Sequence, residues 1–245
     1  MRIALSLIFS LIIVRGYGQA AVDYMHNRMT IDRMAAVGVS SNATSIASFP
    51  GSPPGLIGDV YLNGDYRNAT FILYDNDKLV QGYPAKLDLQ RNEFDLLTTT
   101  GVRTLAGSFV RSLVWRDSVS KTPQYFVNGK EFRNEDDVPL LGFYQILSDG
   151  ELNLLKHTEL IFKPADTRNI THKVGSGDDK YTKKPHLYYV VGAKAYVLPR
   201  KKAITELFKD RKEEMDNFIK INGIDLNLDY HVVAVFDHYN ALVTK

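Results

Sequence analysis

Apolar and polar residues mostly alternate along residues 56–198, with a period of two. This is the period of a strand with one buried face, because successive side chains point to opposite sides of a sheet. Pairs that favour tight turns, such as Asn63-Gly64, Asn128-Gly129 and Asp149-Gly150, separate the alternating runs. The strands predicted in this way are 59–62, 69–74, 83–89, 93–97, 102–105, 108–115, 124–127, 142–147, 152–162 and 187–197.

Turns of this length join antiparallel strands and are too short for the crossovers that parallel strands need. We therefore expect residues 56–198 to form a mainly antiparallel β domain, either a curved sheet or an open, barrel-like one. Within the 108–115 strand, the expected core residues are Phe109, Leu113 and Trp115.

After residue 198 the period changes to that of amphipathic helices. A first helix is predicted over 201–208, with its apolar face formed by Ile204, Leu207 and Phe208. The sequence Asp210-Arg211-Lys212-Glu213 resembles a capping box, which would open a second helix. That helix is predicted to end near Asn222-Gly223, because glycine commonly follows the last turn of a helix.

A third helix is predicted from 230 to 242, with Asp229 as its N-cap. Its apolar residues recur at helical spacing and are Val232, Val235, Phe236, Tyr239 and Leu242. Residues 199–245 are thus expected to form about three C-terminal helices that pack on the sheet or on one another. The fold class expected for the chain is α+β.

The first residues have the features of a secretory signal peptide. Arg2 precedes an apolar run of 12 residues, 3–14, and small residues follow at Gly18 and Ala20. Signal peptides have apolar runs of about 7–15 residues, whereas a membrane-spanning helix needs roughly 20. Residues 1–20 are therefore predicted to be an export signal, with an uncleaved anchor as the alternative. The mature protein is expected to be periplasmic or extracellular, without a transmembrane segment.

Residues 21–55 are interpreted as an N-terminal arm or linker. Their second part, 37–55, is rich in serine, glycine and proline, a composition typical of connecting segments.

Charge and cysteine content narrow the function classes. The chain has 30 Lys and Arg against 28 Asp and Glu, a net charge of +2, and the predicted signal contributes Arg2 and Arg15. Its removal leaves a net charge of 0, so no overall field attracts nucleic acid and no such partner is expected. The chain has no cysteine, which excludes disulfides, thiol catalysis and lipid attachment to a cysteine. The basic clusters 180–184 and 200–202 are interpreted as solvated surface, with a polyanion site as the alternative.

Several segments resemble a family of uncharacterised exported proteins common in Bacteroidota. The segments that carry the resemblance are 58–62, 83–89, 93–97, 102–105, 109–115, 149–156, 175–181 and 238–240. Together they extend over most of the chain after the predicted arm. The resemblance implies export, and it implies no catalytic, cofactor or metal-binding residue because the family has no established activity.

A direct search for hydrolase and phosphate-binding motifs gives no assignment. Gly175-Ser176-Gly177 lacks the Gly-x-Ser-x-Gly spacing of a nucleophile elbow. Glycine-rich backbone binds phosphate in some loops, but Asp178 and Asp179 follow here and would repel an anion. A polar hairpin or loop is the favoured interpretation of this segment.

No candidate set of metal ligands has the residues and the spacing that a known metal site requires. His231 and His238 are seven residues apart, which separates them by roughly 10 Å on a helix, too far to share one ion. Asp75-Asn76-Asp77 lacks the glycine and glutamate that an EF-hand loop requires, and a turn is predicted there. Glu135-Asp136-Asp137 is interpreted as an exposed loop, with a calcium-binding role as the alternative. The Asn-x-Ser/Thr patterns at Asn42, Asn68 and Asn169 are not expected to carry glycans.

Two functions remain from these observations. The favoured one is a non-enzymatic binding or interaction module, whose ligand would be an apolar small molecule or a cell-envelope protein. The alternative is an exported hydrolase with a site assembled from distant residues. The candidates for such a site are His157, His172 and His186 with Asp178 or Asp179. The sequence assigns no catalytic residue, cofactor or metal ligand.

Overall fold

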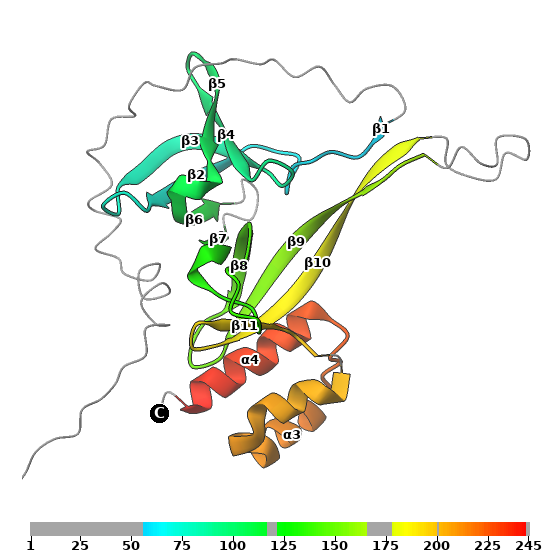
Figure 1. The fold of residues 1–245 in the computed structure, drawn as a ribbon. Coiled ribbons are helices and arrows are strands. Elements are labelled where there is room, and N and C mark those ends of the chain that lie inside the picture. Colours follow the sequence, from blue (N-terminus) through cyan, green and yellow to red (C-terminus); the bar gives the residue numbers. More distant parts are fainter. Residues whose placement is uncertain (1–55, 117–121, 166–177, 200, 244–245) are drawn as a thin grey trace, which may run out of the picture.

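The computed structural model describes residues 56–116, 122–165, 178–199 and 201–243. The predicted signal peptide 1–20 and arm 21–55 lie outside these residues. Within the described ranges, the chain forms one large open sheet followed by two α-helices, which confirms the α+β class (Figure 1).

The sheet has eleven strands in the order β1-β10-β9-β8-β7-β6-β2-β3-β4-β5, and β11 also pairs with β10. The strands are β1 (Leu56–Ile57), β2 (Arg67–Leu73), β3 (Leu79–Asp88), β4 (Glu93–Thr98), β5 (Gly101–Ala106), β6 (Val110–Arg116), β7 (Pro123–Asn128), β8 (Phe143–Ser148), β9 (Asn153–Lys163), β10 (Asp179–Val191) and β11 (Lys194–Val197). Neighbouring strands are antiparallel, as predicted, except for the parallel pair β1–β10. A parallel pair needs a long connection between its two strands. β1 and β10 meet this condition because they are far apart in the sequence.

One predicted strand is absent from the described residues, and another is divided in two. Residues 59–62 form a connecting segment, in which Tyr61 makes one isolated bridge to Asp88 at the end of β3. Residues 187–197 are two strands, because the chain turns at Gly192, where φ is +61°. The first of them, β10, already begins at Asp179. Its lysines and Pro185 hide the alternating pattern, and an edge position accommodates a proline that cannot donate a ladder hydrogen bond.

One core cluster lies under the sheet portion from β2 to β7. Trp115 and Leu113 are fully buried there, as predicted, and the Trp115 ring lies 5.7 Å from that of Phe126. Phe109, however, is 63% exposed, so its assignment to the core is wrong. It belongs to the 3-10 turn Gly107–Phe109 that precedes β6, where the period of two does not yet apply.

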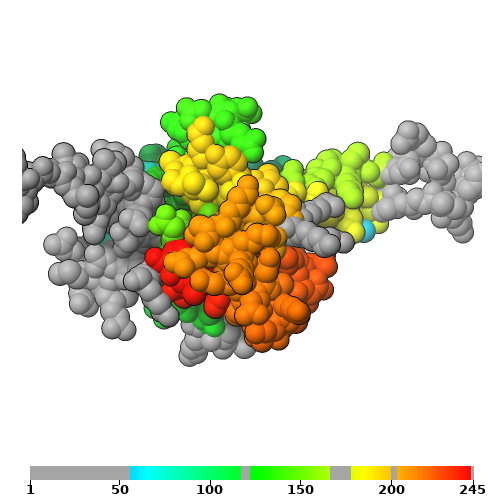
Figure 2. Space-filling view, turned by 90° about the horizontal axis from the view of Figure 1, so that it is seen from below, coloured from blue at the N-terminus to red at the C-terminus, as the bar shows by residue number. Residues whose placement is uncertain are grey.

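The helical segments cover the other end of the sheet. The α-helices α3 (Lys212–Ile221) and α4 (Asp229–Val243) and the 3-10 segment η5 (Lys201–Arg211) enclose a second core with the start of β9. Figure 2 shows this helical layer from below. The buried residues of the layer are Ile204, Phe208, Met215, Val232, Val235, Phe236 and Tyr239.

The helix boundaries partly follow the predictions. The first predicted helix is a 3-10 segment with non-helical backbone at Phe208, so the described residues 201–243 contain two α-helices instead of the three that were predicted. No side-chain capping bond forms at the start of α3, because Arg211 rather than Asp210 occupies the N-cap. The predicted end at Asn222-Gly223 is confirmed. Gly223 has φ +59°, and the N–H of Ile224 donates to the carbonyl of Ile219 over 3.0 Å.

The β9–β10 pair extends well beyond the rest of the sheet (Figure 1). β9 pairs with β10 from residue 153 to residue 163, but it pairs with β8 only through residues 154–157. The outer half of β9 therefore lies next to open space on the β8 side, across from the β3–β4 turn.

Candidate ligand-binding cleft

A cleft of about 350 Å³ lies between the outer half of β9 and the β3–β4 turn. This volume is at the lower end of the range for small-molecule sites, roughly 300–1,000 Å³. The cleft is lined by Leu87, Leu89, Gln90, Asn92, Gly142, Phe143, His157, Thr158, Glu159, Leu160, Phe162 and Tyr181. Half of these side chains are apolar or aromatic, and the polar ones offer amide, hydroxyl, imidazole and carboxylate groups.

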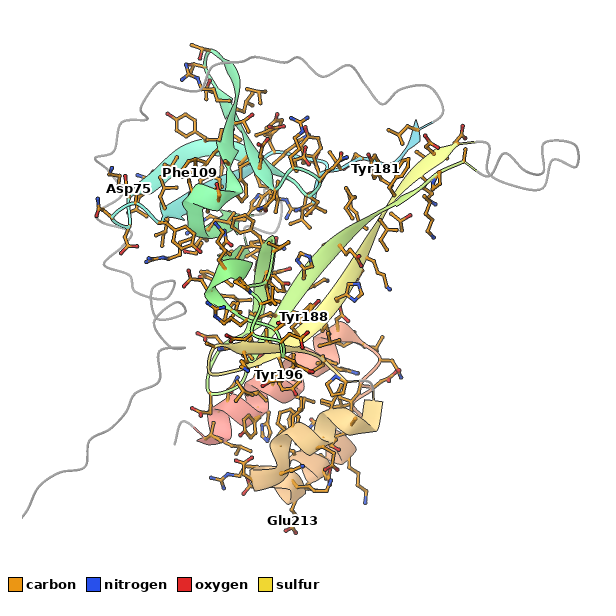
Figure 3. The ribbon with its side chains drawn as sticks, viewed as in Figure 1. Asp75, Phe109, Tyr181, Tyr188, Tyr196 and Glu213 are labelled. Atoms are coloured by element: carbon orange, nitrogen blue, oxygen red, sulfur yellow. The ribbon has the colours of Figure 1, made fainter. Side chains whose placement is uncertain are left out.

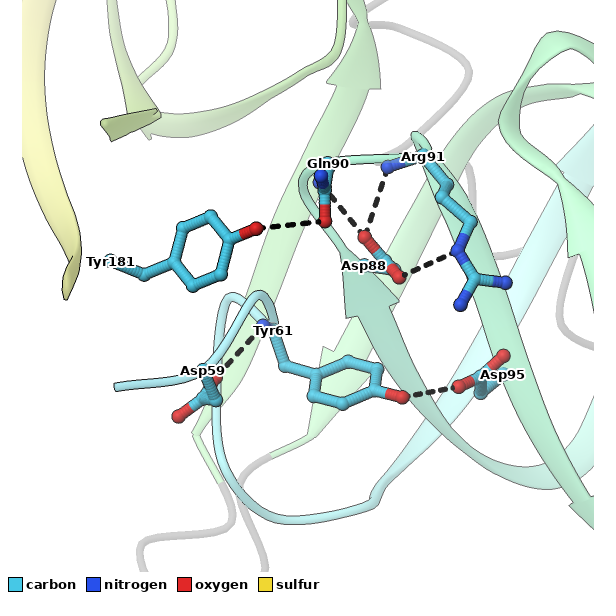
Figure 4. A network of polar contacts seen from close by, with 7 residues as sticks. All are labelled: Asp59, Tyr61, Asp88, Gln90, Arg91, Asp95 and Tyr181. Carbon is cyan, nitrogen blue, oxygen red and sulfur yellow. Dashed lines mark hydrogen bonds and ion pairs between the residues drawn. The ribbon is translucent and has the colours of Figure 1, made fainter. Parts of the chain in front are cut away.

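The β3–β4 turn is held by the buried carboxylate of Asp88. Its Oδ1 accepts hydrogen bonds from the backbone N–H groups of Gln90 (2.8 Å) and Arg91 (3.0 Å). Its Oδ2 lies 3.5 Å from Nε of Arg91. This arrangement directs the Gln90 side chain toward β10, where the hydroxyl of Tyr181 donates to it over 3.5 Å (Figure 4).

The connecting segment 58–62 joins the two walls of the cleft. A Cβ on Gly58 would lie 2.7 Å from the carbonyl oxygen of Tyr181, so only glycine fits beside β10. Asp59 pairs with Lys183 of β10 over 2.9 Å. At the other end of the segment, the Tyr61 hydroxyl donates to Asp95 of β4 over 2.8 Å.

Tyr61 is a structural anchor and not a base. Its burial and the hydrogen bond to Asp95 raise the pKa of Tyr61 well above the usual tyrosine value. Its hydroxyl therefore stays protonated and donates at neutral pH. The ammonium group of Lys86 lies over the rings of Tyr61 and Tyr66, at 5.3 and 4.6 Å, and adds cation–π contacts to the same group.

His157 forms part of the cleft wall where β8 leaves β9. Its ring stacks on Tyr144 at 4.6 Å, and its Nδ1 lies 3.2 Å from the carbonyl oxygen of Phe143. Because a carbonyl only accepts, Nδ1 carries the proton and Nε2 is left as an acceptor in the neutral ring. Burial lowers the pKa of His157, so the neutral form predominates at neutral pH.

This pKa shift predicts a pH dependence of folding. Unfolded His157 has a pKa near 6.5, whereas the folded protein binds this proton only at lower pH. The free energy of unfolding should thus be highest above pH 6.5 and fall as the pH decreases through the folded pKa. Urea unfolding between about pH 7.5 and pH 5 tests this. We expect His157→Gln to show a shallower decline, and equal declines in both proteins would contradict the assignment.

The structure brings together only part of the predicted hydrolase set. His157 enters the cleft, and His186, its cross-strand partner, pairs with Glu159 over 3.0 Å. Asp178 and Asp179 do not line the cleft, and Asp179 accepts a hydrogen bond from the backbone of Ala165 over 2.7 Å. His172 lies outside the described residues. Among the described residues, no hydroxyl group hydrogen-bonds to a histidine.

The two candidate histidines of the helical tail, His231 and His238, make contacts that stabilise the fold. His231 Nδ1 accepts from the backbone N–H of Asp225 over 2.9 Å, and His238 stacks on Phe218 at 3.8 Å. The described part of the chain holds no group of three possible metal ligands.

The two acidic runs are turns or exposed loops, as predicted. Asp75 and Asp77 pair with Lys78 and Arg111, each over 2.5 Å. The 135–137 run is exposed. Of the glycosylation patterns only Asn68 is described, and it lies on β2; Asn42, Asn169 and the 175–177 glycine segment lie outside the described residues.

Most residues of the cleft could not be assigned a role from the sequence. Gln90 and Asn92 belong to a segment that the sequence identifies only as a turn. His157 and Glu159 are two apart on one strand, which predicts a shared face. That spacing was the only available signal, and it does not indicate which distant turn faces them.

The fold defines this chain as an α+β protein with a large, mostly antiparallel open sheet and two C-terminal α-helices. No known family model, curated protein or solved structure matches the chain. Membership of the exported family therefore stays a prediction. In the described ranges, no helix has both the length and the apolar character that crossing a membrane requires.

Segments that carry the resemblance contact one another in space, and two of these contacts join segments far apart in the sequence. Gly58 of the first segment lies against Tyr181 of the 175–181 segment. Asn240 of the last segment bonds the backbone of Leu152 in the 149–156 segment. At both places the contacts are backbone packing and buried hydrogen bonds, so these residues have structural roles.

Proposed function

We propose that this protein is an exported, non-enzymatic binding or interaction module that takes its ligand in the β9 cleft. The observation that carries the proposal is the cleft itself, in which an apolar and aromatic wall is combined with a few hydrogen-bonding groups. Export rests on the pattern of residues 1–20. The ligand is an apolar small molecule or a cell-envelope protein.

Binding is favoured over catalysis by the state of the polar groups around the cleft. The imidazole of His157 is bonded to a backbone carbonyl, and that of His186 to Glu159. The raised pKa of Tyr61 keeps its hydroxyl protonated. A hydrolase needs a nucleophile within hydrogen-bond reach of its base, and the described residues contain no histidine with such a partner.

Filling the cleft tests this proposal. Thr158 lines the cleft on β9, so Thr158→Trp should occupy the space that a ligand needs. Thr104, an exposed threonine on β5, provides the control variant Thr104→Trp. We expect the amphiphilic fluorophore 1-anilinonaphthalene-8-sulfonate, whose aromatic rings enter apolar sites, to bind the unmodified protein and Thr104→Trp equally, and Thr158→Trp about tenfold more weakly, a loss of about 1.4 kcal/mol.

The fluorophore titration is to be paired with circular dichroism to show that each variant is folded. Equal affinity for all three proteins would contradict the cleft as the ligand site. A loss of affinity in Thr104→Trp alone would place the binding surface elsewhere.

A further inference from the structure

The outer half of β9 exposes backbone hydrogen-bonding groups to the cleft. Every second residue of a strand directs its N–H and C=O to the same edge. From residue 158 to residue 163, that edge pairs with no strand and accepts no backbone hydrogen bond among the described residues. An open strand edge is a template on which another extended chain forms a ladder.

This edge lacks one common protection against strand addition, a proline in the strand. β9 contains no proline, whereas β10 carries Pro185 in the stretch of its outer edge between β1 and β11. A proline removes one ladder donor and weakens strand addition there. On the β9 side, the β3–β4 turn and Gly142 line the opposite wall of the cleft. They leave a narrow site beside the edge, which excludes bulky partners.

We propose that the cleft binds an extended segment of a partner polypeptide, which adds to β9 as a further strand. This inference rests on the proposed binding function and identifies its ligand class. Main-chain hydrogen bonds to residues 158–163 would supply affinity, and side-chain contacts with the cleft walls would supply selectivity.

Exposed lysines at the outer end of the edge favour an acidic residue in the partner segment. Among the described residues, the one carboxylate that lines the cleft, that of Glu159, is hydrogen-bonded to His186 over 3.0 Å. Lys163 and Lys180 are direct cross-strand partners, and both are exposed. Like charges directly opposite each other destabilise a strand pair. Neither they nor Lys184, the cross-strand partner of Glu159, forms an ion pair with another described residue. A carboxylate of the added strand would relieve the repulsion between Lys163 and Lys180.

The cleft wall adds a preference for an aromatic or apolar residue. Phe162 is 50% exposed and its ring lies 5.2 Å from that of Tyr181. Leu160 and Leu89 line the same space. The partner chemistry is therefore an extended, acidic segment with at least one apolar or aromatic side chain, since one face of the added strand would contact this wall.

Disulfide capture offers a sensitive test because the chain has no cysteine of its own. The full chain carrying Thr158→Cys is incubated with an eight-residue peptide of alternating Glu and Val with a central Tyr and one Cys. The comparison peptides have the same sequence with three backbone N-methyl groups, or with Lys in place of Glu. Thr104→Cys on the terminal strand β5 serves as the control for an ordinary strand edge.

We expect Thr158→Cys to capture the acidic peptide about tenfold more than the N-methylated one, because methylation removes ladder hydrogen bonds worth about 1 kcal/mol each. Adding Lys163→Glu and Lys180→Glu should reverse the preference between the acidic and basic peptides. The charge-matched control, Lys209→Glu with Lys220→Glu on the helical segments, should leave it unchanged. Thr104→Cys should show no preference for acidic peptide.

Equal capture of methylated and unmethylated peptides would overturn strand addition. If the fluorophore still bound Thr158→Trp more weakly than the unmodified protein in that case, the proposed binding function would be retained and only the polypeptide ligand class would be rejected. Binding to phosphatidylglycerol vesicles that depends on Lys163 and Lys180, without any peptide preference, would assign these lysines to a lipid surface and also overturn the proposal.

Discussion

Replacing Trp115 with alanine is expected to lower the free energy of unfolding by about 3–5 kcal/mol, the usual cost of removing a large buried aromatic ring. Trp115 is fully buried in the cluster under β2 to β7, next to Phe126. Its loss removes apolar burial and leaves a cavity that the paired strands cannot easily fill. Urea unfolding followed by circular dichroism measures the change, because Trp115 is the only tryptophan and its fluorescence is lost.

Phe109→Ala is the matched control for this prediction. The two residues are six positions apart, but Phe109 is 63% exposed. Its replacement should change the free energy of unfolding by no more than about 0.5 kcal/mol. Similar effects of both substitutions would contradict the placement of the two rings.

The second large effect is expected at the β8–β9 turn, which α4 contacts through Asn240. The buried side chain of Asn240 accepts from the backbone N–H of Leu152 over 3.0 Å and donates to the Leu152 carbonyl over 3.0 Å. It also donates to Ser148 Oγ over 3.2 Å. Asn240→Ala leaves buried backbone groups unsatisfied, and we expect a loss of about 2–4 kcal/mol.

Gly150→Ala should be destabilising for a related reason. A Cβ at residue 150 would lie 2.5 Å from Cγ of Asn240, closer than real Cβ contacts allow. The single substitution is expected to cost about 1–3 kcal/mol through overpacking. In the Asn240→Ala background Cγ and Oδ1 of residue 240 are absent and only its Cβ, 2.8 Å away, still obstructs, so Gly150→Ala should cost less than in the unmodified protein.

A double-mutant cycle in urea measures this coupling. The effects of Gly150→Ala and Asn240→Ala should be clearly less than additive. Additive effects would show that the helix and the turn are not in contact. Asn222→Ala, on the exposed end of α3, is a suitable asparagine control because its side chain bonds only the local carbonyl of Phe218.

The strand pattern was predictable wherever one face is buried. The alternating runs that became β2 to β9 were found because local periodicity reports which face meets the core. Phe109 was misplaced because a 3-10 turn breaks the period just before β6. β10 was detected only in its second half because its first half carries lysines and Pro185 on an exposed extension. A short-range alternating pattern arises only where one face of a strand is buried. This extension buries few side chains, so the pattern is absent there.

The cleft was not predictable, and neither was the edge beside it. Glu159 and His157 could be placed on one strand, but the turn that faces them, at Gln90 and Asn92, is far away in the chain. Whether β9 extends beyond β8 depends on where each pairing ends. Pairing lengths are determined by contacts between strands, so they leave no local signal.

The sequence alone thus determined the α+β class, most strands, the helical character of the tail, the end of α3 at Asn222-Gly223, and the absence of any cysteine chemistry. These properties follow from local periodicity, turn residues and composition. Only the tertiary structure decided which strand edge is open, which residues line the cleft and how Asn240 contacts the β8–β9 turn. The physical reason is that these features arise where distant segments meet, and their contacts depend on the packing of the whole sheet.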